Sequence, residues 1–223
     1  MGNGADDARL VADAVTKYIG SKENWPRSSG YGERIDLALI NAVMSIQARF
    51  GSQLPDGSFN GLRGAVERYR AAHADLTGDW FQSLAAQEES ALLSVLTRSK
   101  FKTGKTKAAA VIEAAQAFLD AGFKTREGII DDLAGAEKAY RSVSGLGPWT
   151  FQYFTMLLGV DSVKPDIWIT RFVSRTVRHE VSASTAFEAV SEAAELLETT
   201  RTELDHAIWA YGNTSGLRDM PKL

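Results

Sequence analysis

Residues 132–160, DLAGAEKAYRSVSGLGPWTFQYFTMLLGV, have the pattern of a helix, a tight glycine turn and a second helix. Gly145 and Gly147 permit positive φ and close backbone approach, and Leu146 between them can fill the space between the helices. Pro148 suits the first turn of the second helix, where its missing N–H costs nothing. Such a turn directs backbone amides outward, where they can hold a phosphate; an ordinary helix connection explains the same residues.

Residues 160–171, VDSVKPDIWITR, follow this hairpin and predict a capped helix. Pro165 disfavours helix at Lys164, and Asp166 then stands at the N-cap position ahead of an apolar helix. A cap of this kind contributes about 1 kcal/mol, which is a complete structural explanation. The functional interpretation is that amides and the helix dipole favour an ionised carboxylate, which can stabilise positive charge on a sugar and orient a water molecule.

Apolar residues recur at spacings of three and four along almost the whole chain, which predicts an all-α fold. We expect two helical lobes, one formed by residues 33–160 and one by residues 1–32 with 161–223. The predicted helices are 6–19, 33–50, 61–73, 88–97, 104–121, 133–143, 148–158, 167–179, 183–199 and 201–211.

Composition limits the classes of function. The 223 residues include 25 basic and 28 acidic side chains, so the formal net charge is −3 and any contact with DNA depends on a local patch. The chain has no cysteine, which excludes a cysteine-ligated iron–sulfur cluster or zinc site, and its histidines lack metal-site spacing. We expect no metal or cofactor. The absence of a signal sequence or a long apolar run predicts a cytoplasmic protein with no membrane partner.

The densest basic segment is residues 99–107, SKFKTGKTK, immediately before an alanine-rich helix. It lacks the first glycine of a nucleotide-binding phosphate loop, because Ser99 occupies that position. Two interpretations remain open: lysines that neutralise a nucleic-acid backbone, with Lys105 and Lys107 as the candidates, or a solvated turn.

The hairpin, the short connection and Asp166 together resemble the helix-hairpin-helix Gly/Pro-Asp (HhH-GPD) superfamily of DNA glycosylases, the endonuclease III, MutY and alkyladenine glycosylase group. Further segments are similar in order and spacing: residues 35–50, which contain Ser45-Ile46-Gln47, residues 105–119, and residues 204–212, LDHAIWAYG. The resemblance covers residues 33–212. It implies a two-lobed fold with duplex DNA in a cleft between the lobes.

The resemblance also implies roles for single residues. Asp166 falls on the family's catalytic aspartate, Gly145 and Gly147 on its hairpin glycines, and Gln47 on a glutamine near the flipped nucleotide. Where bifunctional members have a lyase lysine, this chain has Trp149, which predicts a monofunctional enzyme. Because the chain has no cysteine, it falls in the cluster-free branch of the family. The residues that we expect at the DNA are Gly145, Leu146, Gly147, Trp149, Thr150, Gln47, Lys105 and Lys107.

An extruded base is commonly held between aromatic faces. The candidates for this pocket are Trp149, Trp168, Tyr31 and Trp25, with Trp149 and Trp168 first because they flank the hairpin and Asp166. Most tryptophans in a helical protein of this size belong to the core. Arg171 can meet a phosphate or pair with an acidic neighbour.

The sequence therefore predicts a nucleoid-associated, monomeric DNA N-glycosylase that acts on a damaged, mispaired or modified base in double-stranded DNA. The alternatives are a noncatalytic helix-hairpin-helix DNA-binding protein and a helical interaction protein. The identity of the base is not predicted.

Overall fold

A computed structural model describes residues 4–27, 30–214 and 216–221, and this part of the chain contains helices, turns and isolated bridges but no strand. The prediction of an all-α protein is confirmed. The chain divides into two compact units: a central unit, Gly30–Val160, and a terminal unit, Met1–Ser29 with Asp161–Leu223. The sequence interpretation placed the first boundary three residues later, between 32 and 33.

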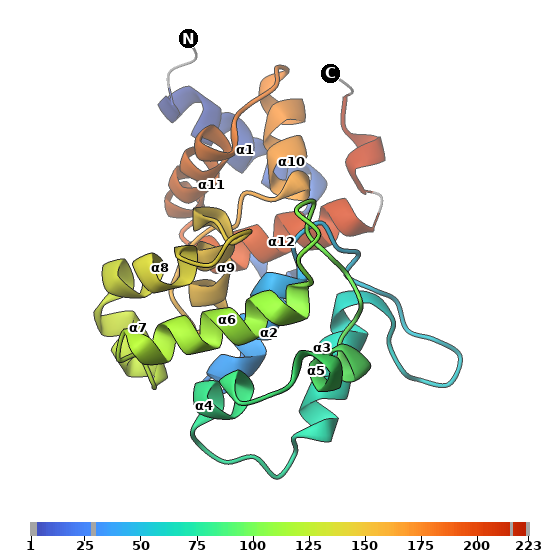
Figure 1. Cartoon of the computed structure of the whole chain (residues 1–223). Helices are drawn as coiled ribbons and strands as arrows, with labels where there is room; N and C mark the ends of the chain where they lie inside the picture. Colours follow the sequence, from blue (N-terminus) through green and yellow to red (C-terminus); the bar gives the residue numbers. More distant parts are fainter. Residues whose placement is uncertain (1–3, 28–29, 215, 222–223) are drawn as a thin grey trace. The chain divides into compact units, whose positions relative to one another are not determined.

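The central unit has its helices in consecutive order along the chain (Figure 1). They are α2 (Ile35–Met44), α3 (Gly61–Ala72), α4 (Trp80–Ala85), α5 (Glu89–Val95), α6 (Lys107–Asp120), α7 (Arg126–Asp131), α8 (Leu133–Arg141) and α9 (Pro148–Leu157). Helix α2 is buried along its whole length and packs on α3, α4, α6 and α9. It is therefore the central element of this core, and its nearly continuous apolar sequence is explained by burial on every side.

Aromatic side chains hold α6, α8 and α9 together in the central unit. The ring of Phe118 stacks on Phe81 with centroids 4.8 Å apart and meets Phe154 at 5.4 Å. Tyr140 from α8 stacks on Phe154 at 6.0 Å. These buried rings fix the two helices that carry the glycine turn.

The terminal unit combines both ends of the chain. Its helices are α1 (Gly4–Tyr18), η1 (Lys22–Asn24), α10 (Ile167–Val177), α11 (Ala183–Leu196), α12 (Arg201–Asn213) and η2 (Gly216–Asp219). Helix α1 packs on α11 and α10, and α10 also packs on α12. Ile169, Phe172 and Val173 form the buried face of α10, which leaves its opposite face for Trp168 and Arg171.

Helix positions differ from the sequence prediction at identifiable places. Helices α4 and α7 were not predicted, because six residues each is too short for a periodic pattern. The helix predicted for residues 33–50 ends at Met44, with Ser45 as its C-cap and Gln47 at a φ of 50°. The helix predicted to begin at Gly104 begins at Lys107, because Thr106 is its N-cap and accepts the Ala109 amide at 3.0 Å.

No helix among the described residues is long and apolar enough to cross a membrane.

Candidate active site

The glycine turn of the central unit connects α8 to α9 through residues 142–147. Gly145 has a φ of +99°, and a Cβ built on it would lie 3.1 Å from the ring of Phe101. Glycine is thus required here both by the backbone conformation and by the neighbouring ring. Leu146 is buried in the core of the unit, where it fills the space between the helices as expected.

Most amides of the turn are already bonded within the protein. The Leu146 amide donates to the Val143 carbonyl at 3.1 Å, and the Gly147 amide donates to Thr150 Oγ1 at 3.1 Å. The Thr150 hydroxyl in turn donates to the Gly147 carbonyl at 2.8 Å. The amides of Leu146 and Gly147 are therefore not available to a ligand. The amides of Ser144 and Gly145, in contrast, form no hydrogen bond with any described residue.

The basic segment 99–107 lies against this turn, because Phe101 contacts Gly145. The segment is folded on itself: the Phe101 amide donates to the Lys105 carbonyl at 2.9 Å, and the backbones of Lys100 and Thr106 form an isolated antiparallel β-bridge. Lys100 and Lys102 are exposed, and neither pairs with a carboxylate among the described residues. These two lysines therefore give a positive charge to the surface beside the Gly145 amide.

The two lysines selected from the sequence have other partners. Lys105 pairs with Glu113 at 2.6 Å, which neutralises its charge. Lys107 is only 3% exposed, and its ammonium donates to the carbonyls of Met44 and Ile46 at the end of α2. The prediction that Lys107 contacts DNA is wrong, because its charge completes the hydrogen bonds of a buried helix end.

The remaining predicted residues of the central unit are partly accessible. Gln47 is exposed just beyond the end of α2. Trp149 is half-buried in the first turn of α9. Tyr31 is half-buried, and its hydroxyl accepts the Asn41 amide at 2.7 Å. Burial raises the pKa of Tyr31, so its hydroxyl stays protonated at neutral pH.

Trp25 belongs to the core of the terminal unit and is 9% exposed. Its indole N–H donates to the Gly20 carbonyl at 3.1 Å. The prediction that Trp25 contacts a base is therefore wrong, because packing and a hydrogen bond account for the whole side chain.

Asp166 caps α10 in the terminal unit, as the sequence predicts. Its Oδ1 accepts the amides of Trp168 at 2.8 Å and Ile169 at 3.2 Å. Its Oδ2 accepts no hydrogen bond from a described residue, and the side chain is half-buried. One carboxylate oxygen is thus fixed by the backbone, while the second is left for another partner.

Two further titratable groups lie beside Asp166. Asp205 on α12 is 8% exposed, and its Oδ1 accepts the Lys164 amide at 2.8 Å. Burial raises the pKa of Asp205 to about 8, and the negative charge of Asp166 adds to this effect. Burial lowers the pKa of Lys164 to about 8, although both carboxylates oppose this change. The site is therefore a group of one lysine and two carboxylates rather than a single aspartate.

Sequence reasoning passed over both neighbours. Lys164 enters the sequence prediction only as the residue before Pro165, and Asp205 only as part of residues 204–212. The available signal was that Asp205 lies between the apolar residues Leu204, Ala207 and Ile208, on the face of α12 that is buried. A carboxylate at such a position requires a partner.

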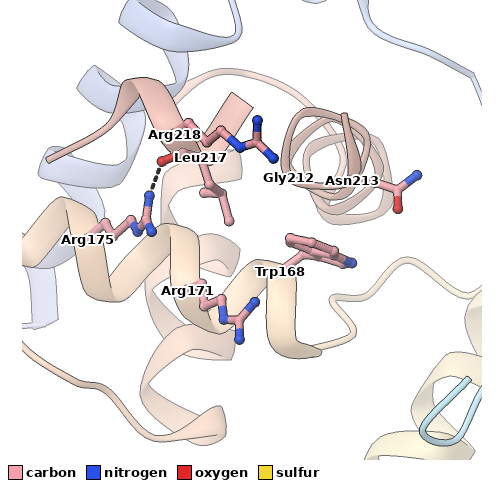
Figure 2. Close-up of a pocket in the computed structure, with 7 residues that line it drawn as sticks. All are labelled: Trp168, Arg171, Arg175, Gly212, Asn213, Leu217 and Arg218. Carbon is pink, nitrogen blue, oxygen red and sulfur yellow. Dashed lines mark hydrogen bonds between the residues drawn. The ribbon is translucent and has the colours of Figure 1, made fainter. Parts of the chain in front are cut away.

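Trp168, which the sequence places in the base pocket, is half-buried on α10 and lines a pocket of the terminal unit. Figure 2 shows Trp168 with Arg171 one turn further along the helix. The Arg171 guanidinium lies 5.8 Å from the centroid of the Trp168 ring.

Fold and site together define an all-helical protein with a glycine-turn helical hairpin in one unit and a capped aspartate in the other. Residues 9–213 match the model of a family described as a domain of unknown function (DUF8548), and the chain belongs to this family. No curated protein and no solved structure matches the chain.

Proposed function

We propose that this protein is a monofunctional DNA N-glycosylase of the HhH-GPD type, with Asp166 as its catalytic residue. The observation that carries the proposal is the geometry of the Asp166 carboxylate. Oδ1 is fixed by two backbone amides at the start of α10, and Oδ2 has no partner among the described residues. A carboxylate held in this way needs no rearrangement to stabilise a positive charge that develops beside it.

The reaction would follow the logic of glycoside hydrolysis. As the bond between the base and C1′ of the sugar lengthens, positive charge develops on the sugar, and Asp166 stabilises it. A water molecule then forms the new bond to C1′ as the bond from C1′ to the base breaks. The proton that the water loses passes to the departing base, directly or by way of Asp166. The product is free base and an abasic site in the DNA. Asp166 also orients the water, because its second oxygen can accept a hydrogen bond from it.

The central unit would hold the DNA backbone. The Gly145 amide has no partner among the described residues, and the exposed Lys100 and Lys102 lie in the segment that packs on Gly145. An amide and two ammonium groups bind phosphate without reading the base sequence. Lys100 and Lys102 thus take the place of Lys105 and Lys107, the lysines chosen from the sequence, as the source of positive charge.

The proposed enzyme lacks a lyase step, because Trp149 stands where bifunctional members have their lysine. Incubation with a duplex that contains an abasic site, followed by borohydride reduction, should give no covalent complex. A covalent complex that disappears in Lys164→Gln would contradict the monofunctional assignment and identify Lys164 as an amine nucleophile.

The direct test is excision from a substrate panel: duplexes that contain uracil, alkylated purines, oxidised bases or hypermodified cytosines. We expect abasic sites with at least one substrate, and an excision rate lowered by about 10²–10⁴-fold in Asp166→Asn. Asparagine caps helices as well as aspartate does, so this variant should stay folded. Asp13→Asn, on the exposed face of α1, is the matched control and should retain the full rate.

The second candidate function, a noncatalytic DNA-binding protein, is favoured by the hairpin and its lysines alone. It predicts duplex binding that weakens with salt, no abasic sites with any substrate, and equal binding by Asp166→Asn and the parent protein.

A further inference from the structure

The terminal unit contains a pocket of about 310 Å³ whose charge is unlike that of the whole chain. Arg171, Arg175 and Arg218 line it together with the indole of Trp168, and none of its lining residues is acidic (Figure 2). The chain as a whole has a formal net charge of −3. The pocket is therefore a local concentration of positive charge on a slightly acidic protein.

Helix α10 supplies most of this charge from one face. Trp168, Arg171 and Arg175 are separated by three and then four residues, so they project from the same side of the helix. Arg218 comes from η2. Two like charges one helical turn apart repel each other, and this arrangement is unfavourable unless an anion binds between or beside them.

The arginines are not neutralised within the protein. Among the described residues, no carboxylate forms an ion pair with any of the three, and Arg175 instead donates to the backbone carbonyl of Leu217. The only other interaction of these guanidinium groups with a described residue is that of Arg171 with the Trp168 ring. Their remaining N–H groups are thus available for an external acceptor.

The rest of the lining consists of the indole, Gly212, the aliphatic Leu217 and the polar Asn213. A Cβ on Gly212 would lie 3.1 Å from the Trp168 ring, so the glycine allows the indole to rest directly on α12. In Figure 2, the Leu217 side chain projects between Arg175 and Trp168. The pocket therefore combines guanidinium groups with an indole and an aliphatic side chain.

We propose that this pocket binds one nucleotide, with the phosphate held by Arg171 and Arg218 and a heterocycle placed against Trp168. Guanidinium groups match the oxygens of phosphate in pairs, and a base stacks on an aromatic face. The nucleotide is either part of a DNA strand or free in solution, because the chemistry of recognition is the same. The proposal does not depend on base excision, since no residue of the reaction is part of it.

The test measures four probes against the full chain. A fluorescein-labelled single-stranded oligonucleotide and the corresponding duplex are titrated by anisotropy, and dAMP and ATP by calorimetry. In Arg171→Gln/Arg218→Gln, we expect at least one affinity to fall about tenfold or more, because charge-assisted hydrogen bonds are lost. Loss for the oligonucleotides alone identifies a strand as the source, and loss for dAMP or ATP identifies a free nucleotide.

Both arginines are exposed, so their replacement should leave the fold intact, which circular dichroism can verify. Arg9→Gln, an exposed arginine on α1 of the same unit, is the matched control for lost charge. Arg171→Lys, which keeps the charge but not the paired geometry, should retain only part of the affinity. Wild-type protein that binds none of the probes, or an equal loss in Arg9→Gln, would overturn the proposal. Excision that persists in the double variant would leave the proposed function intact.

Discussion

The glycine turn and the start of α10 both present a helix N-terminus, but they differ in how that terminus is satisfied. At the turn, the Gly147 amide donates to the Thr150 hydroxyl, and the nearby charges belong to exposed lysines. At α10, a side-chain carboxylate bonds the first amides and lies beside a second, buried carboxylate.

Because the two helix starts are satisfied differently, substitutions at them should affect different properties of the protein. Geometry at the turn depends on φ angles and on the hydrogen bonds between Gly147 and Thr150, so its variants should change stability and affinity for phosphate. At the start of α10, loss of the carboxylate charge should leave the helix cap in place and, under the proposed function, change excision. The effect of losing a lysine charge should likewise depend on position. It should lower stability at the buried Lys107 and weaken DNA binding at the exposed Lys102.

The largest effect on stability is expected for Lys107→Met. Loss of the ammonium leaves the carbonyls of Met44 and Ile46 without a donor, which should lower the free energy of unfolding by about 3 kcal/mol. Urea denaturation measures it. Lys102→Met is the matched control: we expect unchanged stability but a salt dependence of DNA binding that falls by about one unit of slope. The reverse pattern would restore Lys107 as the DNA contact.

A smaller effect is expected from pH. The pKa of Asp205 is raised to about 8, so the folded state retains a proton that the unfolded chain loses above its ordinary value of 3.8. Stability from this group is present at low pH and is lost as the pH rises to about 8. Lys164 adds little below about pH 7, where it is protonated in both states, and above that pH its lowered pKa acts in the opposite direction.

We expect the free energy of unfolding to be about 2 kcal/mol lower at pH 8 than at pH 6 through this group. Asp205→Asn keeps the acceptor for the Lys164 amide and cannot ionise, so the decrease should disappear in that variant. An identical pH profile for both proteins would show that Asp205 does not hold its proton.

Gly145→Ala should cost about 1–2 kcal/mol, because alanine is strained at a φ of +99° and its Cβ meets the Phe101 ring. Gly147→Ala is the control, since that position has an extended φ of −126° and open space around it. Thermal unfolding of both variants gives the comparison. Equal destabilisation would contradict the assignment of the strained conformation to Gly145 alone.

The smallest effect, about 1 kcal/mol, is expected for Thr150→Val, which removes both hydrogen bonds between Thr150 and Gly147 at nearly constant volume. The variant also frees the Gly147 amide. If that amide is unimportant to DNA in the parent protein, affinity for a duplex should not decrease. A marked loss of affinity would instead show that the Thr150 hydroxyl itself contacts the DNA.

The sequence was sufficient for features that depend on local residues. Helical periodicity predicted the all-α fold, and the order proline, aspartate, apolar helix predicted the Asp166 cap. Glycines and Pro148 predicted the turn and the start of α9. In each case the deciding groups are within a few residues of one another.

The sequence was insufficient where a side chain finds its partner in another helix. Lys107 is one of several lysines in a basic segment, but its partners lie some sixty positions earlier at the end of α2. Trp25 was one of the candidates for the base pocket, yet it fills the core of the terminal unit. The Asp205 carboxylate accepts a hydrogen bond from the backbone amide of Lys164, 41 positions earlier. Spacing along the chain contains no record of these contacts.

The central claim is that Asp166 is a catalytic carboxylate and not only a helix cap. The most direct measurement is the single-turnover excision rate of Asp166→Asn on the best duplex of the substrate panel, at protein concentrations that saturate the DNA. We expect unchanged DNA affinity and stability, with an excision rate lowered by about 10²–10⁴-fold. A rate equal to that of the parent protein, with the variant folded and bound, would contradict it.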